Sequence, residues 1–331
     1  MKRLMGAMCL LLHLPALAAG LDPTEVARFA EEMRQHDFDP AELSILLARA
    51  QRLDTVLAAI SKPAEYKPWH AYRPIFVTPR RIEDGRAFWE RNASILDAAA
   101  ASSGVPPEII VSIIGVETGY GTNAGSYRVV DALGTLAFHY PPRAPFFRKE
   151  LGEFLILARE EVADPLSLKG SYAGAMGIPQ FMPSSFRAYA VDFDGDGKRD
   201  IWHSPQDAIG SVANYLKVHG WQAGKPIAFR ALDSASNPRE VSQGVDLMHT
   251  LAEFEARGVR PDGQAEPDAR AVLLAFEGPT ANEYWLGLQN FYSITRYNRS
   301  PKYALAVFQL AEEIRAARLT RAAAAATEAP R

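Results

Sequence analysis

The 331-residue chain has a single cysteine, no excess of basic residues and only one long apolar run. Cys9 lies inside that run at the N-terminus, so the rest of the chain can form no disulfide and offers no thiol for catalysis. The formal net charge of −3 leaves no basic surplus, and no nucleic-acid partner is expected. Beyond the N-terminal run, no apolar stretch reaches the twenty residues of a membrane span, and no internal repeat is present. The composition otherwise is that of a globular protein with ample material for a core.

Residues 1–19 are predicted to be a signal peptide. Two basic residues precede an apolar run over residues 4–17, and a small-residue cleavage site ends at Ala18. We therefore expect a soluble protein exported to the periplasm. A lipoprotein is the alternative interpretation of Cys9. However, Met8 is bulkier than the residue usual before a lipidated cysteine, and Cys9 comes early, so lipid anchoring is not expected.

The most informative stretch covers residues 105–121 and reads VPPEIIVSIIGVETGYG. Paired prolines suit the first turn of a helix, and isoleucines then recur at helical spacing, which predicts one strongly apolar face. Glu117 lies seven and four residues beyond Ile110 and Ile113, so it continues this apolar stripe. Gly119 and Gly121 follow and break the helix, which leaves Glu117 at its C-terminal mouth.

A carboxyl on an apolar stripe supports two interpretations. Desolvation raises the pKa of a buried carboxyl, and a group that stays protonated near neutral pH is what a general acid needs. Alternatively, Glu117 is a core residue whose charge is satisfied by backbone N–H groups. The single segment does not decide between them.

An acidic loop follows at residues 192–203, with the sequence DFDGDGKRDIWH. Three aspartates at alternate positions and a glycine at the sixth position resemble a calcium-binding EF-hand loop, in which the seventh residue offers its backbone carbonyl. The proposed ligands are Asp192, Asp194, Asp196 and the Lys198 carbonyl. A solvated acidic turn is the alternative.

The loop departs from the EF-hand pattern where a bidentate glutamate is expected. His203 stands at that twelfth position and is a poor calcium ligand. Asp207 is the next carboxylate and can close a longer loop. The sequence SPQD ending at Asp207 is also a capping-box arrangement, so Asp207 has two candidate roles.

The remaining pattern is mainly helical. Helices are expected over residues 22–60, 81–102, 129–138, 146–162, 207–219 and 245–256. A proline- and aromatic-rich connector is expected at 62–79, and short strands are expected at 226–230, 271–276 and 283–288. A small β-containing lobe is therefore predicted late in an α+β chain.

Four stretches together are similar to the membrane-bound lytic murein transglycosylase B family. They are the Glu117 segment, the run GSYAGAMGIPQFMPSSFRAYAVDFDGDG, the helix DAIGSVANYLKVHGW and the stretch FYSITRYNRSPKYALAVFQL. The resemblance spans about residues 80–310, in the family's order. It implies a lysozyme-like catalytic core with a helical domain and a small β-containing domain, acting on peptidoglycan glycan strands.

The resemblance also implies roles for individual residues. Glu117 corresponds to the single catalytic acid/base, and calcium is expected in the loop held by Asp192, Asp194, Asp196, Lys198 and Asp207. The positions that match the family's glycan groove are Ser171, Gln180, Tyr215, Tyr297, Asn298 and Tyr303. The expected partners are peptidoglycan glycan strands, which are the substrate, and unidentified proteins of cell-wall synthesis or division. The enzyme itself is expected to be a monomer.

The expected organisation has six parts. They are a signal peptide (1–19), an N-terminal helical region (20–104), a lysozyme-like core (105–224) whose EF-hand-like loop spans 192–207, a β-containing lobe with a groove segment (225–299), a C-terminal helix (300–318) and a disordered tail (319–331).

The expected reaction cleaves the β-1,4 bond between N-acetylmuramic acid and N-acetylglucosamine and forms a 1,6-anhydromuramoyl end. Most glycosidases use two carboxylates. The nearest second acid, Asp131, lies in a helical pattern where a cap or an exposed face is expected. A lysozyme-type hydrolase that uses water and a non-catalytic peptidoglycan-binding protein are the alternatives.

Overall fold

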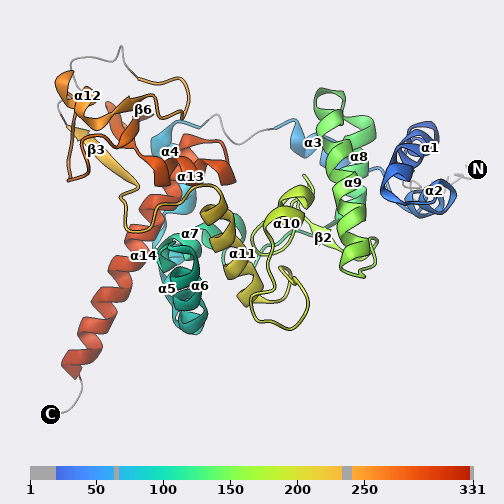
Figure 1. Ribbon diagram of the computed structural model, residues 1–331, viewed down its shortest axis with the longest axis horizontal. Coiled ribbons are helices and arrows are strands. Elements are labelled where there is room, and N and C mark those ends of the chain that lie inside the picture. Colours follow the sequence, from blue (N-terminus) through green and yellow to red (C-terminus); the bar gives the residue numbers. More distant parts are fainter. Residues whose placement is uncertain (1–19, 63–66, 233–240, 329–331) are drawn as a thin grey trace, which may run out of the picture.

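The N-terminal part of the molecule is a set of short helices at one end of an elongated structure. The computed structural model describes residues 20–62, 67–232 and 241–328, and the predicted signal peptide with Cys9 lies outside them (Figure 1). The first elements are α1 (Pro23–Glu32), η1 (Met33–His36), α2 (Pro40–Leu47) and α3 (Asp54–Ile60). Both α1 and α2 begin with an Asp-Pro pair, in which the aspartate carboxylate accepts hydrogen bonds from two backbone N–H groups of the first turn.

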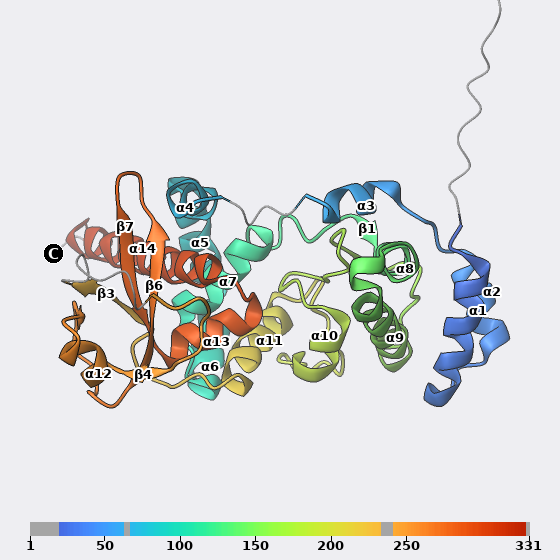
Figure 2. The same cartoon turned by 90° about the horizontal axis from the view of Figure 1, so that it is seen from above.

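Two antiparallel helices form the next layer along the long axis. These are α8 (Val129–His139) and α9 (Ala144–Glu160), joined by η3 (Pro141–Arg143). Nine residues of each helix are buried, because both sit between the N-terminal helices and the centre of the molecule (Figure 2). A two-stranded ribbon of β1 (Tyr127–Arg128) and β2 (Lys169–Gly170) brackets this pair in the sequence.

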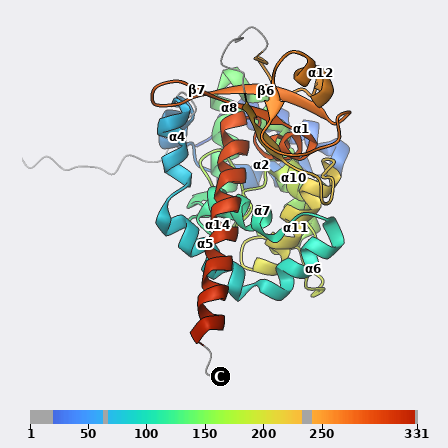
Figure 3. The same cartoon turned by 90° about the vertical axis from the view of Figure 1, so that its left-hand side faces the viewer.

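The centre of the molecule is built around α7 (Pro107–Thr118), which is buried along most of its length. The helices that surround it or flank its neighbours are α4 (Trp69–Phe76), α5 (Pro79–Arg91), α6 (Ala93–Ser103), α10 (Pro183–Tyr189), α11 (Pro205–Val218), α13 (Gln289–Tyr297) and α14 (Pro301–Glu328). Figure 3 looks along this part of the molecule and shows α14 crossing in front of α7. The isoleucine stripe predicted from the sequence therefore faces protein on all sides, which is why an ionised group at its end is costly.

The β-containing lobe lies at the end opposite α1 and α2. Its antiparallel sheet has the order β4-β6-β7-β3-β5. The strands are β3 (Ala228–Leu232), β4 (His249–Thr250), β5 (Arg260–Pro261), β6 (Arg270–Glu277) and β7 (Asn282–Gly287), and α12 (Leu251–Ala256) covers one face. The three longest strands match the three predicted ones. The face around Leu251, Phe254 and Leu286 forms a small core separate from the main one.

Four expectations about boundaries were wrong. The single helix expected over 81–102 is two helices, because the chain turns at Asn92, which bonds back to the Phe88 carbonyl. The connector expected at 62–79 contains α4. In the helix expected over 245–256, only the second half is helical, as α12, because irregular chain and β4 precede it. The tail expected to be disordered from residue 319 continues α14 as far as Glu328, as its run of alanines favours.

Among the described residues, no single helix is long and apolar enough to cross a membrane. The helices α6 and α7 reach such a length only as a pair bent by 112°.

Candidate active site

Glu117 occupies the last turn of α7, one residue before the helix ends at Thr118. The predicted apolar stripe is confirmed: Ile110, Ile113 and Ile114 are fully buried. Glu117 itself is half-buried, so its carboxyl lies at the border between the core and the surface. This is the mouth of the helix that the sequence predicted.

Burial sets the protonation of Glu117. Desolvation raises the pKa of its carboxyl to about 7, and a hydrogen bond from the Tyr303 hydroxyl opposes that rise because it stabilises the charged form. The Tyr303 oxygen lies 2.6 Å from Glu117 Oε1. No acidic side chain is among the causes of the shift. The carboxyl is thus able both to give up and to take back a proton near neutral pH.

The end of α7 is fixed by contacts that the sequence did not reveal. Arg81 donates to the Gly115 carbonyl at 2.9 Å, and the Tyr120 hydroxyl donates to the Arg81 carbonyl at 2.7 Å. Tyr120 has a left-handed backbone, with φ of 65°, and its ring lies so close to Gly115 that a Cβ there would approach it to 2.6 Å. Glu117 is therefore carried on a helix end whose position is closely determined.

The glycine-rich segment after β2 lies beside this helix end. Gln180 has a positive φ of 53° and donates through Nε2 to the carbonyls of Ala124 and Gly177. Within the described part of the chain, no hydrogen bond to its Oε1 is present, so that oxygen can accept from a ligand. Ser171 holds the start of the segment, where its hydroxyl accepts from the Ala175 N–H at 3.0 Å.

The six residues predicted to line the groove fall into two sets. Ser171, Gln180, Tyr297 and Asn298 are half-buried, and they can face a ligand. Tyr215 and Tyr303 are buried, with 7% and 3% of their surface exposed.

Tyr215 is held by contacts inside the protein. Its hydroxyl donates to the Arg296 carbonyl at 2.6 Å, and its ring packs between His219 and Tyr297. The expectation that Tyr215 belongs to the glycan groove stays a prediction, and in the structure its ring packs against Tyr297 and supports it. Tyr297 in turn donates to the Pro179 carbonyl at 2.6 Å, beside Gln180.

Asp131 is engaged elsewhere. It is 4% exposed, forms an ion pair with Arg128 at 2.6 Å and accepts from the Gln51 N–H at 2.9 Å. The expectation of a cap or an exposed face was wrong on exposure, since the carboxylate is buried. Its contacts join α8 to the segment after α2, so they leave Asp131 with a structural role.

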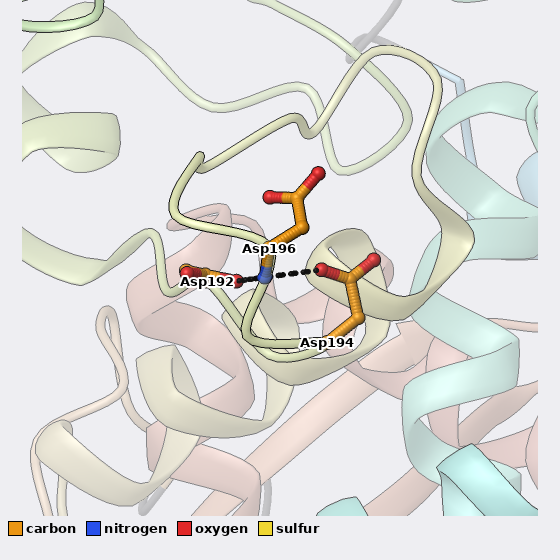
Figure 4. A group of neighbouring side chains, drawn as sticks. All are labelled: Asp192, Asp194 and Asp196. Atoms are coloured by element: carbon orange, nitrogen blue, oxygen red, sulfur yellow. Dashed lines mark hydrogen bonds between the residues drawn. The ribbon is translucent and has the colours of Figure 1, made fainter.

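The three aspartates of the acidic loop converge, as the sequence predicted. Asp192, Asp194 and Asp196 each place a carboxylate oxygen within 4.8 Å of the others, with Asp194 and Asp196 exposed (Figure 4). Backbone N–H groups of the loop turn inward onto Asp192, including that of Gly197 at 2.8 Å. Clustered carboxylate oxygens at a sharp turn are the donor set that a hard cation such as Ca²⁺ takes.

Asp207 does not join this cluster. It is 1% exposed, and its two oxygens accept from the N–H groups of Phe193 and Asp200, each at 2.8 Å. Burial raises the pKa of Asp207, and these two hydrogen bonds oppose the rise. Asp207 therefore closes the loop from the inside.

The capping box expected at Asp207 is only partly present. Ser204 caps α11 by accepting from the Asp207 N–H at 3.1 Å, while the Asp207 carboxylate points to the loop, so the capping box is half formed. His203 contacts Asp200 and is mostly exposed. Lys198 donates its N–H to Asp196, and its side chain is exposed.

Three comparisons place this geometry among known proteins. The family model described as "Transglycosylase SLT domain" matches residues 22–312. The chain is 45% identical over 303 residues to the membrane-bound lytic murein transglycosylase B of Escherichia coli (strain K12), covering 88% of this chain and 83% of that protein.

Solved structures agree with the sequence comparison. Soluble lytic transglycosylase SltB1 from Pseudomonas aeruginosa matches with a TM-score of 0.83 and 56% identity, over 89% of this chain and 99% of that chain. The Escherichia coli lytic transglycosylase Slt35 in complex with calcium matches with a TM-score of 0.83 and 43% identity, over 94% of this chain and all of that chain. The predicted fold class is confirmed.

Proposed function

This chain belongs to the transglycosylase SLT domain family and is a lytic murein transglycosylase, and we propose that Glu117 is its single catalytic acid and base. The observation that carries the proposal is the state of this carboxyl. Burial raises its pKa to about 7, Tyr303 orients it, and no acidic side chain contributes to its titration. A single group that can alternate between acid and base fits a reaction whose nucleophile belongs to the substrate.

The reaction then needs two proton transfers, and the Glu117 carboxyl takes part in both. Protonated Glu117 gives its proton to the glycosidic oxygen between N-acetylmuramic acid and N-acetylglucosamine, and the bond from C1 to that oxygen breaks. The 6-hydroxyl oxygen of the same muramoyl residue attacks C1, and its proton returns to Glu117. Intramolecular attack is favoured by proximity, and the apolar border around Glu117 disfavours competing water.

The groove residues have separate tasks in this proposal. Gln180 and Asn298 carry side-chain amides at the half-buried border, where they can bond hydroxyl and acetamido groups of the glycan. Tyr303 orients the catalytic carboxyl, and Tyr297 holds the Pro179 backbone beside Gln180.

Calcium is proposed as a structural ion of the acidic loop. The chemistry of the residues fits this ion, because carboxylate oxygens of three aspartates lie within 4.8 Å of one another. Their negative charges repel one another unless a cation is bound between them. Asp192, Asp194 and Asp196 would hold the ion, and its role would be to neutralise the loop. The proton transfers above are carried out by Glu117 and involve no metal ion.

The substrate and the N-terminal sequence point to the cell envelope. We propose that residues 1–19 direct export and that the enzyme acts as a monomer in the periplasm on peptidoglycan glycan strands. Processing can be checked by determining the N-terminal residue of the protein recovered from the periplasm.

Product analysis tests the proposed function. Purified enzyme and its Glu117→Gln variant are incubated with sacculi, and the released muropeptides are analysed by mass spectrometry. The proposal predicts 1,6-anhydromuramoyl ends with the parent enzyme and none with the variant. Reducing ends would indicate a hydrolase, and products from both proteins would remove Glu117 from the catalytic role.

A further inference from the structure

The last residue of α7 carries a buried hydroxyl that connects the catalytic helix to another part of the chain. Thr118 is 2% exposed, and its Oγ1 lies 2.9 Å from the Ile178 carbonyl and 3.2 Å from the Ile114 carbonyl. The same oxygen accepts from the Gly121 N–H at 3.0 Å. A hydroxyl has one proton to donate, and the shorter contact gives it to Ile178.

The backbone of Ile178 forms hydrogen bonds with two different segments. Its carbonyl accepts from Thr118, and its N–H donates to the Ile201 carbonyl at 2.9 Å. The two segments approach so closely that a Cβ on Gly177, whose φ is 65°, would lie 2.5 Å from the Ile201 oxygen. A single residue of the glycine-rich segment, Ile178, therefore joins the end of α7 to the acidic loop.

The far end of this path is held by Asp207. Its carboxylate accepts from the Asp200 N–H, next to fully buried Ile201, and from the Phe193 N–H on the other side of the loop. Trp202 adds a second tie, since its ring N–H donates to the Lys169 carbonyl at 3.0 Å. The acidic loop is thus bonded both to β2, at Lys169, and to the glycine-rich segment, at Ile178.

We propose that Thr118 is a positioning residue for Glu117, and that its bond to Ile178 makes the placement of the catalytic carboxyl depend on the acidic loop. The inference rests on the proposed role of Glu117. The coupling runs through hydrogen bonds between residues of the protein and does not require a bound metal ion.

The position of Thr118 at the helix end explains why it can control the placement of Glu117. Glu117 is adjacent to Thr118 in the last turn of the helix, because Gly119 follows with a left-handed backbone, so contacts with other segments determine where this turn lies. Losing the hydroxyl leaves the Ile178 carbonyl and the Gly121 N–H without this partner, and the last turn shifts to satisfy them. A displacement of about 1 Å at a catalytic group can lower the rate on the order of a hundredfold.

Three variants separate positioning from general support. Thr118→Val keeps the shape but removes the hydroxyl, Thr118→Ser restores the hydroxyl, and Ser112→Ala removes a different buried hydroxyl on the same helix, which bonds the Val307 carbonyl at 2.6 Å. Thermal unfolding, kcat, KM and the pH profile are measured for each. Glu117→Gln is run in parallel as the test of the proposed function itself.

The expected results are specific. Thr118→Val lowers kcat by about ten- to a hundredfold with little change in KM, and it moves the alkaline limb of the pH profile, because Glu117 sits in an altered environment. Thr118→Ser recovers most of kcat. Ser112→Ala loses thermal stability comparably but keeps kcat and the pH profile. Parent-like kcat in Thr118→Val, or equal losses in all three variants, would overturn the proposal while an inactive Glu117→Gln left the catalytic assignment in place.

A double-mutant cycle tests the dependence on the loop. Asp207→Asn preserves size but weakens the bonds that hold the turn before Ile201. We expect it to lower kcat by about tenfold, and we expect Thr118→Val to lower kcat by less than a further twofold in that background. Fully multiplicative losses, or an Asp207→Asn enzyme with parent kcat, would overturn the coupling to the loop.

Discussion

The catalytic centre and the acidic loop are both built from carboxylates, yet their surroundings are opposite. Glu117 stands alone at the border of the core, with a tyrosine hydroxyl as its bonded partner. In the loop, Asp192, Asp194 and Asp196 converge within 4.8 Å, mostly exposed, and are met by backbone N–H groups. The first arrangement favours a neutral acid, and the second favours charge and a cation.

The difference shows how the same functional group acquires different chemistry. Burial without a counter-charge makes the ionised form of Glu117 costly, so its proton is available for transfer. Clustering at the surface costs the aspartates mutual repulsion, which a bound cation relieves. Substitutions that alter the burial of Glu117 should therefore change its protonation, and substitutions that remove an aspartate from the loop should change cation binding.

The largest effect is expected from Glu117→Gln. The amide is nearly isosteric but has no acidic proton to give to the leaving oxygen, so turnover should fall by at least about a thousandfold, or roughly 4 kcal/mol of transition-state stabilisation. Release of soluble muropeptides measures the loss. Binding of glycan strands should persist, and a variant with substantial turnover would contradict the assignment.

The same variant should be more stable than the parent at alkaline pH. The folded pKa of Glu117 lies above its ordinary value of 4.5, so the folded state holds the proton more tightly. The parent therefore loses stability as pH rises from about 4.5 to about 7, by at most about 3 kcal/mol. Urea unfolding of both proteins at pH 4.5 and pH 8 should show a gap that opens only at the higher pH.

Removing calcium should produce the next largest effect, and it should appear as a loss of stability. If the ion binds only the folded protein, saturation at a hundredfold excess over its dissociation constant stabilises by about 2.7 kcal/mol. Chelator should lower the melting temperature of the parent, and calcium should restore it. Asp192→Asn should abolish most of this response, whereas Asp54→Asn, at an exposed carboxylate on α3 in the N-terminal part of the molecule, should retain it. A parent protein that ignores chelator would exclude the metal site.

Asp207→Asn should separate closing the loop from binding the ion. Because both oxygens of Asp207 are occupied by backbone N–H groups, the variant should lose about 1–3 kcal/mol of stability with or without calcium. Calorimetry should find calcium affinity changed much less than by Asp192→Asn. A loss of affinity as large as that of Asp192→Asn would restore the sequence interpretation of Asp207 as a ligand.

The smallest effect is expected from Tyr303→Phe. The lost hydrogen bond lowers the pKa of Glu117 in the parent, so that pKa should rise in the variant and the alkaline limb of the activity profile should move to higher pH. We expect kcat to fall about tenfold, because the carboxyl also loses its orienting partner. An unmoved alkaline limb would mean that Tyr303 does not act through Glu117.

Periodicity accounts for what the sequence predicted correctly. The isoleucine stripe fixed the helix and placed Glu117 at its end, and the alternation of aspartates predicted a converging turn. The position of the strands late in the chain followed from short apolar runs between turn residues.

Long-range partners account for what it could not predict. Tyr215 looks like any groove tyrosine in sequence, and only the fold shows its hydroxyl bonded to the Arg296 carbonyl, 81 residues away. Asp207 stands in the sequence where a metal ligand is expected, but both of its carboxylate oxygens accept hydrogen bonds from backbone N–H groups of its own loop. Thr118 has no sequence signal at all, since its partner Ile178 lies 60 residues away and is engaged through its backbone.

The central claim is that Glu117 is a carboxyl protonated near neutral pH, and its titration can be observed directly. Carbon-13 NMR of protein labelled at the glutamate carboxyl carbons, compared with Glu117→Gln, assigns the resonance of this residue. We expect this resonance to titrate with a pKa of about 7, above the ordinary value of 4.5. A resonance that titrates at or below the ordinary value would contradict it.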